Sequence, residues 1–366
     1  MTLELSRRLF DDDSSWEPLY YYGYYSRRLL DFDAARANQS AEAIRFARAL
    51  RFIRSNYTIK KLARRMLNFY DRFMRHDAAL YWEPNHILLG HVRARKKLLT
   101  VHDLSCILYP QWHPRERLDF WRANFQRGAE KADMIVTVSD TIRASVAEYT
   151  GVPEERVKFV HNGVDHELFR PLPAGELADF RARHNLPERY FLCVGSLEPR
   201  KNLKNLLSAW LSLPRSATAR HKLLLIANDG WKNGEIMELI RRGEESGAVI
   251  LIKNAAFSDL PFYYNLAEMF MYLSFYEGFG LPPLEAMACG TPVLVSDIPV
   301  HREILADAAA YVEPGSADII AQRLEDLLIN PPGKDNASGK RAHRASLYSW
   351  DKSAEAYAAI MKDLRE

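Results

Sequence analysis

Two glutamates around a short loop rich in glycine and proline have the spacing that most plainly suggests chemistry. Glu277 and Glu285 lie in the segment FYEGFGLPPLEAMACGTPVLVS, residues 275–296. Gly278 and Gly280 let the backbone approach a ligand without obstruction by a Cβ atom. Because an ionised carboxylate only accepts hydrogen bonds, Glu285 suits the paired hydroxyls of a ribose. Glu277, before the glycines, suits the hydroxyls of a second group.

The prolines place this loop at the start of a helix. Pro282 and Pro283 suit a first helical turn, because the N–H groups they lack would be unpaired there. The other N–H groups of that turn can hold phosphate oxygens. Glu285 is expected within the first turn, where the helix dipole by itself also favours an acid. A purely structural acid is therefore the alternative to ribose binding.

Two adjacent cations form a second candidate site. The segment CVGSLEPRKNLKNLL, residues 193–207, predicts a strand, a glycine turn and a helix that begins near Arg200 and Lys201. Two cations at a helix N-terminus conflict with its dipole, so we expect them to face an anion such as a diphosphate. The alternative is a solvated basic turn.

Three histidines lie near predicted strand ends or turns. His102, in LLTVHDLS, is expected at a strand end that faces a cleft, although a structural pair with Asp103 is the alternative. His161, before the turn of Asn162 and Gly163, is expected to be structural. His113 is a weaker candidate for contact with an acceptor.

Short apolar runs that alternate with helical segments are expected to hold these residues. The runs are residues 96–103, 134–139, 156–163, 190–195, 222–227, 248–252, 269–274 and 292–296. Continuous apolarity indicates strands buried on both faces, and the alternation predicts α/β domains with doubly wound parallel sheets. After the run at 134–139, Ser139 suits a helix N-cap and Gly151 its C-terminal cap.

Length and a proline-rich break divide the chain into two domains. With 366 residues, two domains are expected, and the segment LFRPLPAG predicts a linker at 168–175. We therefore place the domains at 1–172 and 173–348, with a terminal helix at 349–366 that packs back on the first. The opening LELSRRLF predicts a helix, so the first strand of a doubly wound domain is expected to be missing.

Composition narrows the class of protein. The net charge of +3 does not by itself indicate a nucleic-acid partner. Cys106, Cys193 and Cys289 fit neither a disulfide framework nor a metal site, which favours a cytoplasmic protein, and the last two are expected in the core. No signal peptide or stretch long enough to span a membrane is expected.

One basic stretch suggests contact with a membrane surface. Residues 44–75 contain ten cations interleaved with apolar and aromatic side chains, and Asp71 is their one acid. Such a stretch is attracted to anionic lipid. A helix with a solvated basic face and an apolar core-facing stripe is an equal alternative, whereas nucleic acid ranks below both.

The segments VGSLEPRKNL and YEGFGLPPLEAMACGTPVL together resemble the retaining glycosyltransferases of family GT4, which have the GT-B fold. Glu277 and Glu285 match the E-x7-E pattern of that family. The segments TVHDLSCILYPQWHP, ADMIVTVSDTIRASV and VHNGVDHELFRP resemble its N-terminal domain, so the resemblance covers about residues 95–366. The mannosyltransferase-B-like subgroup, which builds bacterial surface polysaccharides, is the most similar.

This resemblance implies two Rossmann-like domains facing each other across a cleft, of which the second binds a nucleotide-sugar donor. It gives the diphosphate to Arg200 and Lys201, the ribose to Glu285 and the donor sugar to Glu277 and His102. It also implies donor contacts from a further set: Gly195, Lys253, Asn254, Phe257, Gly278, Phe279, Gly280 and Leu281. Such enzymes need no metal, so neither a metal nor a further cofactor is expected.

The resemblance predicts transfer of a hexose, mannose from GDP-mannose, with retention. The acceptor is expected to be a lipid-linked glycan or polysaccharide in O-antigen, lipopolysaccharide or exopolysaccharide synthesis, at the cytoplasmic membrane face. The alternatives are a UDP-sugar-dependent transferase, a GT-B sugar-nucleotide epimerase and an inactive nucleotide-sugar-binding protein. The last is favoured by the absence of the family's first strand and glycine-rich loop before Thr2.

Overall fold

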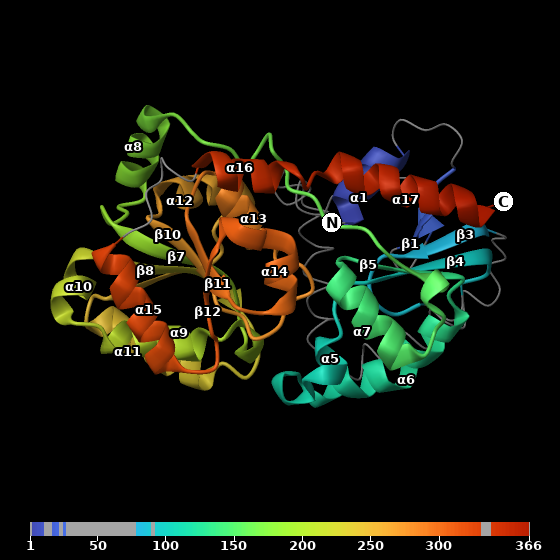
Figure 1. Cartoon of the computed structure of the whole chain (residues 1–366), viewed down its shortest axis with the longest axis horizontal. Helices are drawn as coiled ribbons and strands as arrows, with labels where there is room; N and C mark the ends of the chain where they lie inside the picture. Colours follow the sequence, from blue (N-terminus) through green and yellow to red (C-terminus); the bar gives the residue numbers. More distant parts are fainter. Residues whose placement is uncertain are drawn as a thin grey trace, which may run out of the picture.

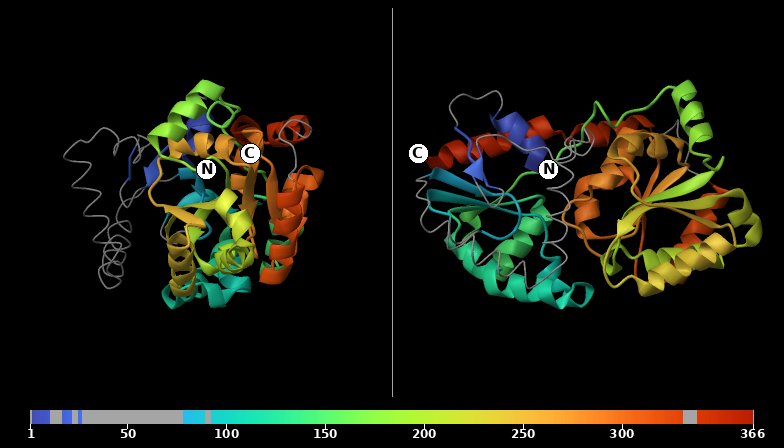
Figure 2. Two further views of the ribbon diagram at one scale, coloured as in Figure 1. Left: turned by 90° about the vertical axis from the view of Figure 1, so that its left-hand side faces the viewer. Right: turned by 180° about the vertical axis from the view of Figure 1, so that it is seen from behind.

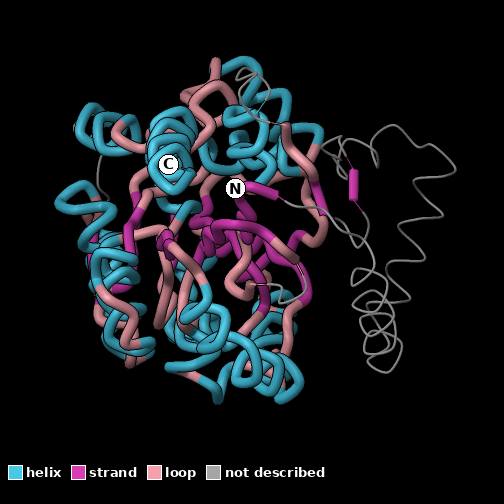
Figure 3. Tube along the Cα trace, turned by 90° about the vertical axis from the view of Figure 1, so that its right-hand side faces the viewer, coloured by secondary structure: helices cyan, strands magenta, loops and turns pink. Residues whose placement is uncertain are grey.

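The computed structural model of the chain describes residues 2–10, 17–21, 25–26, 78–88, 92–330 and 338–365. Within these ranges the chain forms two α/β domains that lie side by side, each with a central parallel sheet (Figure 1). Helices cover both faces of each sheet, so that the strands form an inner layer (Figure 3). The doubly wound, two-domain fold expected from the sequence is confirmed.

The first domain contains a four-stranded sheet of order β3-β4-β5-β6, in which every pairing is parallel. Its strands are β3 (Ala78–Glu83), β4 (Ala94–Val101), β5 (Met134–Thr137) and β6 (Val157–Phe159). One face packs against α5 (Ser105–Leu108), α6 (Arg115–Lys131) and α7 (Asp140–Thr150). The other face packs against α1 (Thr2–Phe10) and α17 (Trp350–Arg365).

The second domain contains a six-stranded parallel sheet of order β12-β11-β10-β7-β8-β9. Its strands are β7 (Tyr190–Leu197), β8 (Lys222–Asp229), β9 (Val249–Ile252), β10 (Met269–Tyr272), β11 (Val293–Ser296) and β12 (Ala310–Val312). One face packs against α9 (Leu203–Ser212), α11 (Gly234–Glu245) and α15 (Ala317–Ile329). The other packs against α8 (Ala174–Arg183), α12 (Leu260–Leu266), α13 (Leu281–Ala288), α14 (Pro299–Leu305) and α16 (Ser338–Ser346). The short α10 (Arg215–Arg220) precedes β8.

The last helix returns to the first domain. In Figure 2 the red α17 runs beside the blue α1, above the sheet of the first domain. Leu5 and Leu9 of α1 share a buried cluster with Tyr357 and Met361 of α17. The Tyr357 hydroxyl lies 3.0 Å from Thr100 Oγ1 of β4. Both ends of the described chain therefore contribute to one face of the first sheet.

Most of the expected elements are present where they were predicted. Each of the eight apolar runs overlaps a strand, β4 to β11, and α1 forms where a helix was expected. Ser139 caps α7, accepting a hydrogen bond from Ile142 N at 3.3 Å, and Gly151 ends it in the left-handed conformation. Cys106, Cys193 and Cys289 are free and buried.

Some segments were missed or lie outside the description. Sequence patterns did not predict β3, β12 or the small antiparallel pair β1 (Tyr20–Tyr21) and β2 (Tyr25–Ser26). The expectation that a first strand is missing stays a prediction. The basic stretch 44–75 falls outside the described residues. Among the helices described, none is both long enough and apolar enough to cross a bilayer.

Candidate active site

The predicted donor-binding residues gather at the carboxyl edge of the second sheet. Arg200 and Lys201 lie in the 3-10 turn Pro199–Lys201 that follows β7. The neighbouring strand β10 leads into the loop of Glu277 to Gly280, after which α13 begins. Adjacent parallel strands end on the same side of a sheet, which is why two segments far apart in sequence meet here.

Glu277 binds both cations. Its Oε2 accepts a hydrogen bond from Arg200 Nη1 at 2.7 Å, and its Oε1 accepts one from Lys201 Nζ at 2.6 Å. All three side chains are at most 14% exposed. Burial by itself would raise the pKa of Glu277, but Arg200 and Lys201 outweigh it and hold that pKa far below its ordinary value. Glu277 is therefore an ionised, buried acceptor.

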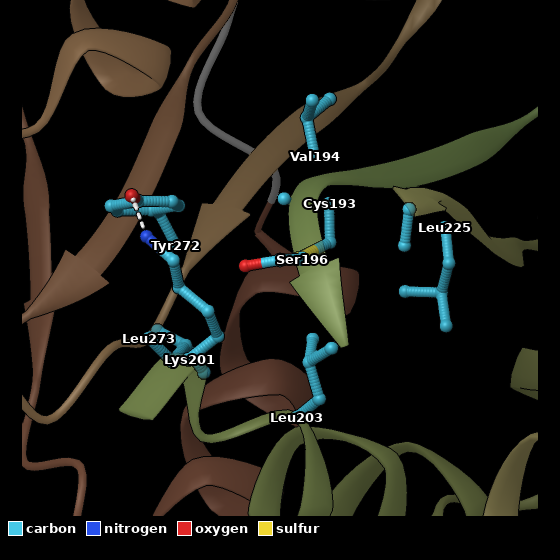
Figure 4. Close-up of a pocket in the computed structure, with 10 residues that line it drawn as sticks. Cys193, Val194, Ser196, Lys201, Leu203, Leu225, Tyr272 and Leu273 are labelled. Carbon is cyan, nitrogen blue, oxygen red and sulfur yellow. Dashed lines mark hydrogen bonds between the residues drawn. The ribbon is translucent and has the colours of Figure 1, made fainter. Parts of the chain in front are cut away.

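Two neighbours that the sequence reasoning missed complete this cluster. Arg200 Nη2 donates to Glu198 Oε1 at 3.0 Å, and Glu198 is buried. Lys201 Nζ also donates to the Tyr272 hydroxyl at 2.6 Å, as the dashed line in Figure 4 shows. Burial lowers the pKa of Lys201, against the attraction of Glu277. A small cavity beside Lys201 is bordered by the predicted donor-binding residue Gly195.

The helix after the loop begins early enough that Glu285 falls outside its first turn. Gly280 is its N-cap in the left-handed conformation, with φ 96°, and α13 starts at Leu281. Pro282 and Pro283 occupy the first turn as expected, which places Glu285 in the second turn. The expectation that Glu285 lies in the first turn was therefore wrong, because the left-handed glycine lets the helix start immediately after it.

Glu285 nevertheless has an unusual environment for an acid. Its Oε2 accepts a hydrogen bond from the buried Tyr264 hydroxyl at 2.9 Å. Burial raises the pKa of Glu285 to about 7, although this hydrogen bond opposes the rise. Among the described residues, no hydrogen bond or ion pair joins Glu285 to the Glu277 cluster.

The residues expected near the base lie farther along the same edge. Lys253 Nζ donates to Asp229 Oδ1 at 2.7 Å, which joins the ends of β9 and β8. The backbone N–H of Asn254 donates to Asn228 Oδ1 at 3.2 Å. Phe257 is 61% exposed, with one edge against Phe169. The structure thus brings this group to the same sheet edge as Arg200, whose own hydrogen-bond partners are Tyr276, Glu277 and Glu198.

His102 follows β4 in the first domain and does not pair with Asp103. His102 Nε2 donates a hydrogen bond to Pro84 O at 2.8 Å, because a carbonyl oxygen can only accept one. Burial lowers the pKa of His102. Asp103 instead accepts a hydrogen bond from Ser105 N at 2.7 Å. Burial would raise the pKa of Asp103, but His86 and the Arg200 guanidinium of the other domain lower it.

Gly278 packs tightly against the first domain. A Cβ atom added to it would lie 1.8 Å from the carbonyl oxygen of His102. Its own carbonyl accepts a hydrogen bond from Ser139 Oγ at 2.8 Å. The side on which a Cβ would project thus faces the first domain, and the expected approach of the Gly278 backbone to a ligand stays a prediction. The loop that carries Glu277 is therefore seated directly on the strand end that carries His102.

The other two histidines lie at the domain interface. His113 is 2% exposed, and its ring lies 5.9 Å from that of Trp231 in the second domain. His161 Nε2 lies 3.0 Å from Glu303 Oε1 of α14. Within the described ranges, no cluster of three or more His, Cys, Asp or Glu side chains has an arrangement that could hold a metal ion.

Two family profiles match the chain. The one described as glycosyl transferases group 1 matches residues 176–345, and the one described as glycosyltransferase family 4 matches residues 24–168. The first match contains the Arg200–Lys201–Glu277 cluster, and the second contains His102. Together the two profiles cover most of both domains.

The chain is also similar to named proteins. It is 31% identical to the O-antigen chain mannosyltransferase B of Escherichia coli, over 74% of this chain and 71% of that protein. It is 29% identical to the O-antigen chain mannosyltransferase RfbU of Salmonella typhimurium, over 60% of this chain and 57% of that protein. A solved structure, WaaG, a glycosyltransferase involved in lipopolysaccharide biosynthesis, superposes with a TM-score of 0.64 at 16% identity, covering 82% of this chain and 81% of WaaG.

Proposed function

The chain belongs to the group 1 glycosyltransferases of family 4, and on that premise we propose that it transfers mannose from GDP-mannose with retention of configuration. The acceptor would be a lipid-linked glycan or polysaccharide in bacterial surface-glycan synthesis, such as an O-antigen chain. The names of two relatives, both O-antigen chain mannosyltransferases, support the choice of sugar and pathway.

The observation that carries the proposal is the buried cluster of Arg200, Lys201 and Glu277. Two cations held within 2.7 Å of one carboxylate are a preformed site for a negatively charged group. A donor diphosphate would compete with Glu277 for these cations. Glu277 would then be free to turn toward the hydroxyls of the donor hexose, so one carboxylate would hold the site together when empty and bind sugar when occupied.

The proposed chemistry needs no nucleophile from the protein. The bond between the anomeric carbon and the diphosphate oxygen breaks, and the acceptor hydroxyl attacks the same face of the sugar. The acceptor's proton passes to the leaving phosphate oxygen. Arg200, Lys201 and the N-terminus of α13, with the amides of Phe279, Gly280 and Leu281, would stabilise the developing negative charge. His102 would contact the donor sugar from the first domain.

The rest of the nucleotide would extend along the sheet edge. Glu285 would accept hydrogen bonds from the ribose hydroxyls, Gly195 would leave room for the phosphates, and the backbone of Gly278 would contact the donor. Lys253, Asn254 and Phe257 lie at the end of β9 and in the turn that follows, where the base would reach them.

We also propose a cytoplasmic site of action at the membrane surface, with residues 44–75 as the membrane contact.

The first test compares GDP with UDP by calorimetry on the full chain, followed by transfer from GDP-mannose and UDP-glucose. We expect GDP to bind at least tenfold more tightly, a difference of about 1.4 kcal/mol. Arg200→Lys should weaken GDP binding by about tenfold, because it keeps the charge but loses the planar fork. The control is Arg189→Lys. Arg189 directly precedes β7, at the end of the strand opposite Arg200, and forms an ion pair with Glu268. A preference for UDP would contradict the mannose assignment.

A further inference from the structure

Glu303 makes polar contacts between the domains at a place separate from the cation cluster. It lies on α14 of the second domain, and its carboxylate reaches the N-terminus of α7 in the first. Oε1 accepts a hydrogen bond from Asp140 N at 2.8 Å. Oε2 accepts from Thr141 N at 2.8 Å and from Thr141 Oγ1 at 2.6 Å. His161 Nε2, also in the first domain, lies 3.0 Å from Oε1.

These contacts complete the cap of α7. The first N–H groups of a helix have no partner within the helix and need an outside acceptor. Ser139 takes the amide of Ile142, at 3.3 Å, and Glu303 takes the two amides before it. Negative charge at a helix N-terminus is further favoured by the helix dipole. One helix cap is therefore assembled from residues of both domains.

Glu303 is held in its charged form. Burial would raise the pKa of its carboxyl, but hydrogen bonds from His161, Thr141 and the backbone amides lower it to about 2. Its side chain is 21% exposed. A charged carboxylate that faces several donors is a strong hydrogen-bond acceptor, so separation of the domains would leave both the carboxylate and the helix amides to water.

The cap is directly connected to the donor loop. Ser139, which precedes α7, also donates through Oγ to the carbonyl of Gly278 at 2.8 Å. On the other side of the same loop, the Tyr276 hydroxyl accepts a hydrogen bond from Leu104 N at 3.2 Å. The Glu303 contact therefore fixes α7 at the position in which Ser139 reaches Gly278 and His102 lies against the loop of Glu277.

We propose that Glu303 is a positioning residue for glycosyl transfer: from the second domain it caps α7 of the first, and so holds the two domains in the arrangement of this structure, which we call closed. Its effect on catalysis rests on the proposed function, whereas its effect on closure does not. Among the described residues the hydrogen-bond partners of the Glu303 carboxylate are Asp140, Thr141 and His161, all in the first domain. Its loss should therefore affect how the domains meet rather than the cations proposed to bind the nucleotide.

The test uses Glu303→Ala in the full chain, with Glu325→Gln on an exposed part of α15 as control. Small-angle X-ray scattering measures the radius of gyration without nucleotide, and calorimetry measures GDP affinity. We expect a larger radius, a fall in kcat of about tenfold or more, and GDP affinity within about twofold of the parent. A local structural defect without a role in closure would not enlarge the molecule.

Other outcomes decide against the proposal. An unchanged radius of gyration would overturn the closure role, whether or not the chain transfers mannose. A larger radius with unchanged kcat would overturn the positioning role. If Glu303→Ala does not fold, the radius of gyration and kcat of Thr141→Val, which removes one of the hydrogen-bond donors, decide in its place. If the parent chain lacks transferase activity but Glu303→Ala opens it, the proposed function fails and the closure role stands.

Discussion

At the scale of single residues, Gly278 is the position where one extra carbon should matter most. An alanine Cβ would lie 1.8 Å from the carbonyl oxygen of His102, far inside contact distance. We predict that Gly278→Ala lowers kcat/KM at least about tenfold, because the loop of Glu277 must move away from the first domain. Steady-state kinetics measures this. Gly175→Ala on α8 has no atom within 4 Å of the new carbon and should leave kcat/KM unchanged. Equal values for the two variants would contradict the interpretation of Gly278.

The raised pKa of Glu285 predicts a pH dependence for donor binding. Burial raises this pKa to about 7, so the carboxyl is ionised above that pH and protonated below it. If the ionised form accepts the ribose hydroxyls, affinity should rise as pH increases through about 7, by about threefold to tenfold. Calorimetry with GDP-mannose measures this, since GDP itself has a phosphate that ionises in the same range. Glu285→Gln should remove the step; a step that persists would remove Glu285 as its cause.

Sequence reasoning found the site residues that lie in one continuous motif and missed those that depend on distant contacts. Glu277, Arg200 and Lys201 were marked by glycines, prolines and charge conflicts visible in the sequence. Nothing in the sequence around Glu303 shows that its carboxylate would accept hydrogen bonds from the N-terminus of α7, because that contact depends on how the two domains meet. Glu198 was a missed opportunity, since an acid two residues before Arg200 can be read directly.

At the scale of elements, α11 offers a matched pair of glycines with opposite expectations. A Cβ on Gly243 would lie 2.3 Å from Val249 Cγ2 of β9, whereas one on Gly234 meets nothing within 4 Å. We predict that Gly243→Ala destabilises the chain by about 1–3 kcal/mol through overpacking. Gly234→Ala, on the same helix, should be neutral or stabilise by up to about 1 kcal/mol. Urea denaturation measures both, and equal changes in stability would contradict this account of the α11–β9 contact.

The elements themselves were predictable where burial leaves a long apolar run. The runs that became β7, β8 and β10 are continuous because helices cover both faces of their sheet. Strand β12 spans only Ala310–Val312, which is too short to show a periodicity. Strand β3 is only partly buried and is directly followed by Pro84. Each of the two lies at one edge of its sheet, with a neighbouring strand on one side only.

At the scale of the whole molecule, the proposed membrane contact can be tested without activity. Reversing Arg45, Arg48, Arg51 and Arg54 to Glu should reduce binding to vesicles of phosphatidylglycerol and phosphatidylcholine at least tenfold, because each cation contributes about 1 kcal/mol near an anionic surface. Sedimentation with the vesicles measures this. Reversing the exposed Arg122, Arg127, Arg215 and Arg220 changes net charge equally and should have a smaller effect. Equal losses would show that only net charge matters, and unchanged binding would remove this stretch as the membrane contact.

The return of α17 to the first domain affects how the chain is made. The sheet face that carries Leu98 and Val136 is buried in part by Trp350, Tyr357 and Met361, which the ribosome adds after the whole second domain. At about 5–20 residues per second, roughly 10–40 s separate the synthesis of Phe159 from that of Trp350. During that interval the second domain can fold, while part of this apolar face of the first domain stays uncovered until α17 is made. A nascent chain of this kind is a natural client for chaperones that bind exposed apolar surface.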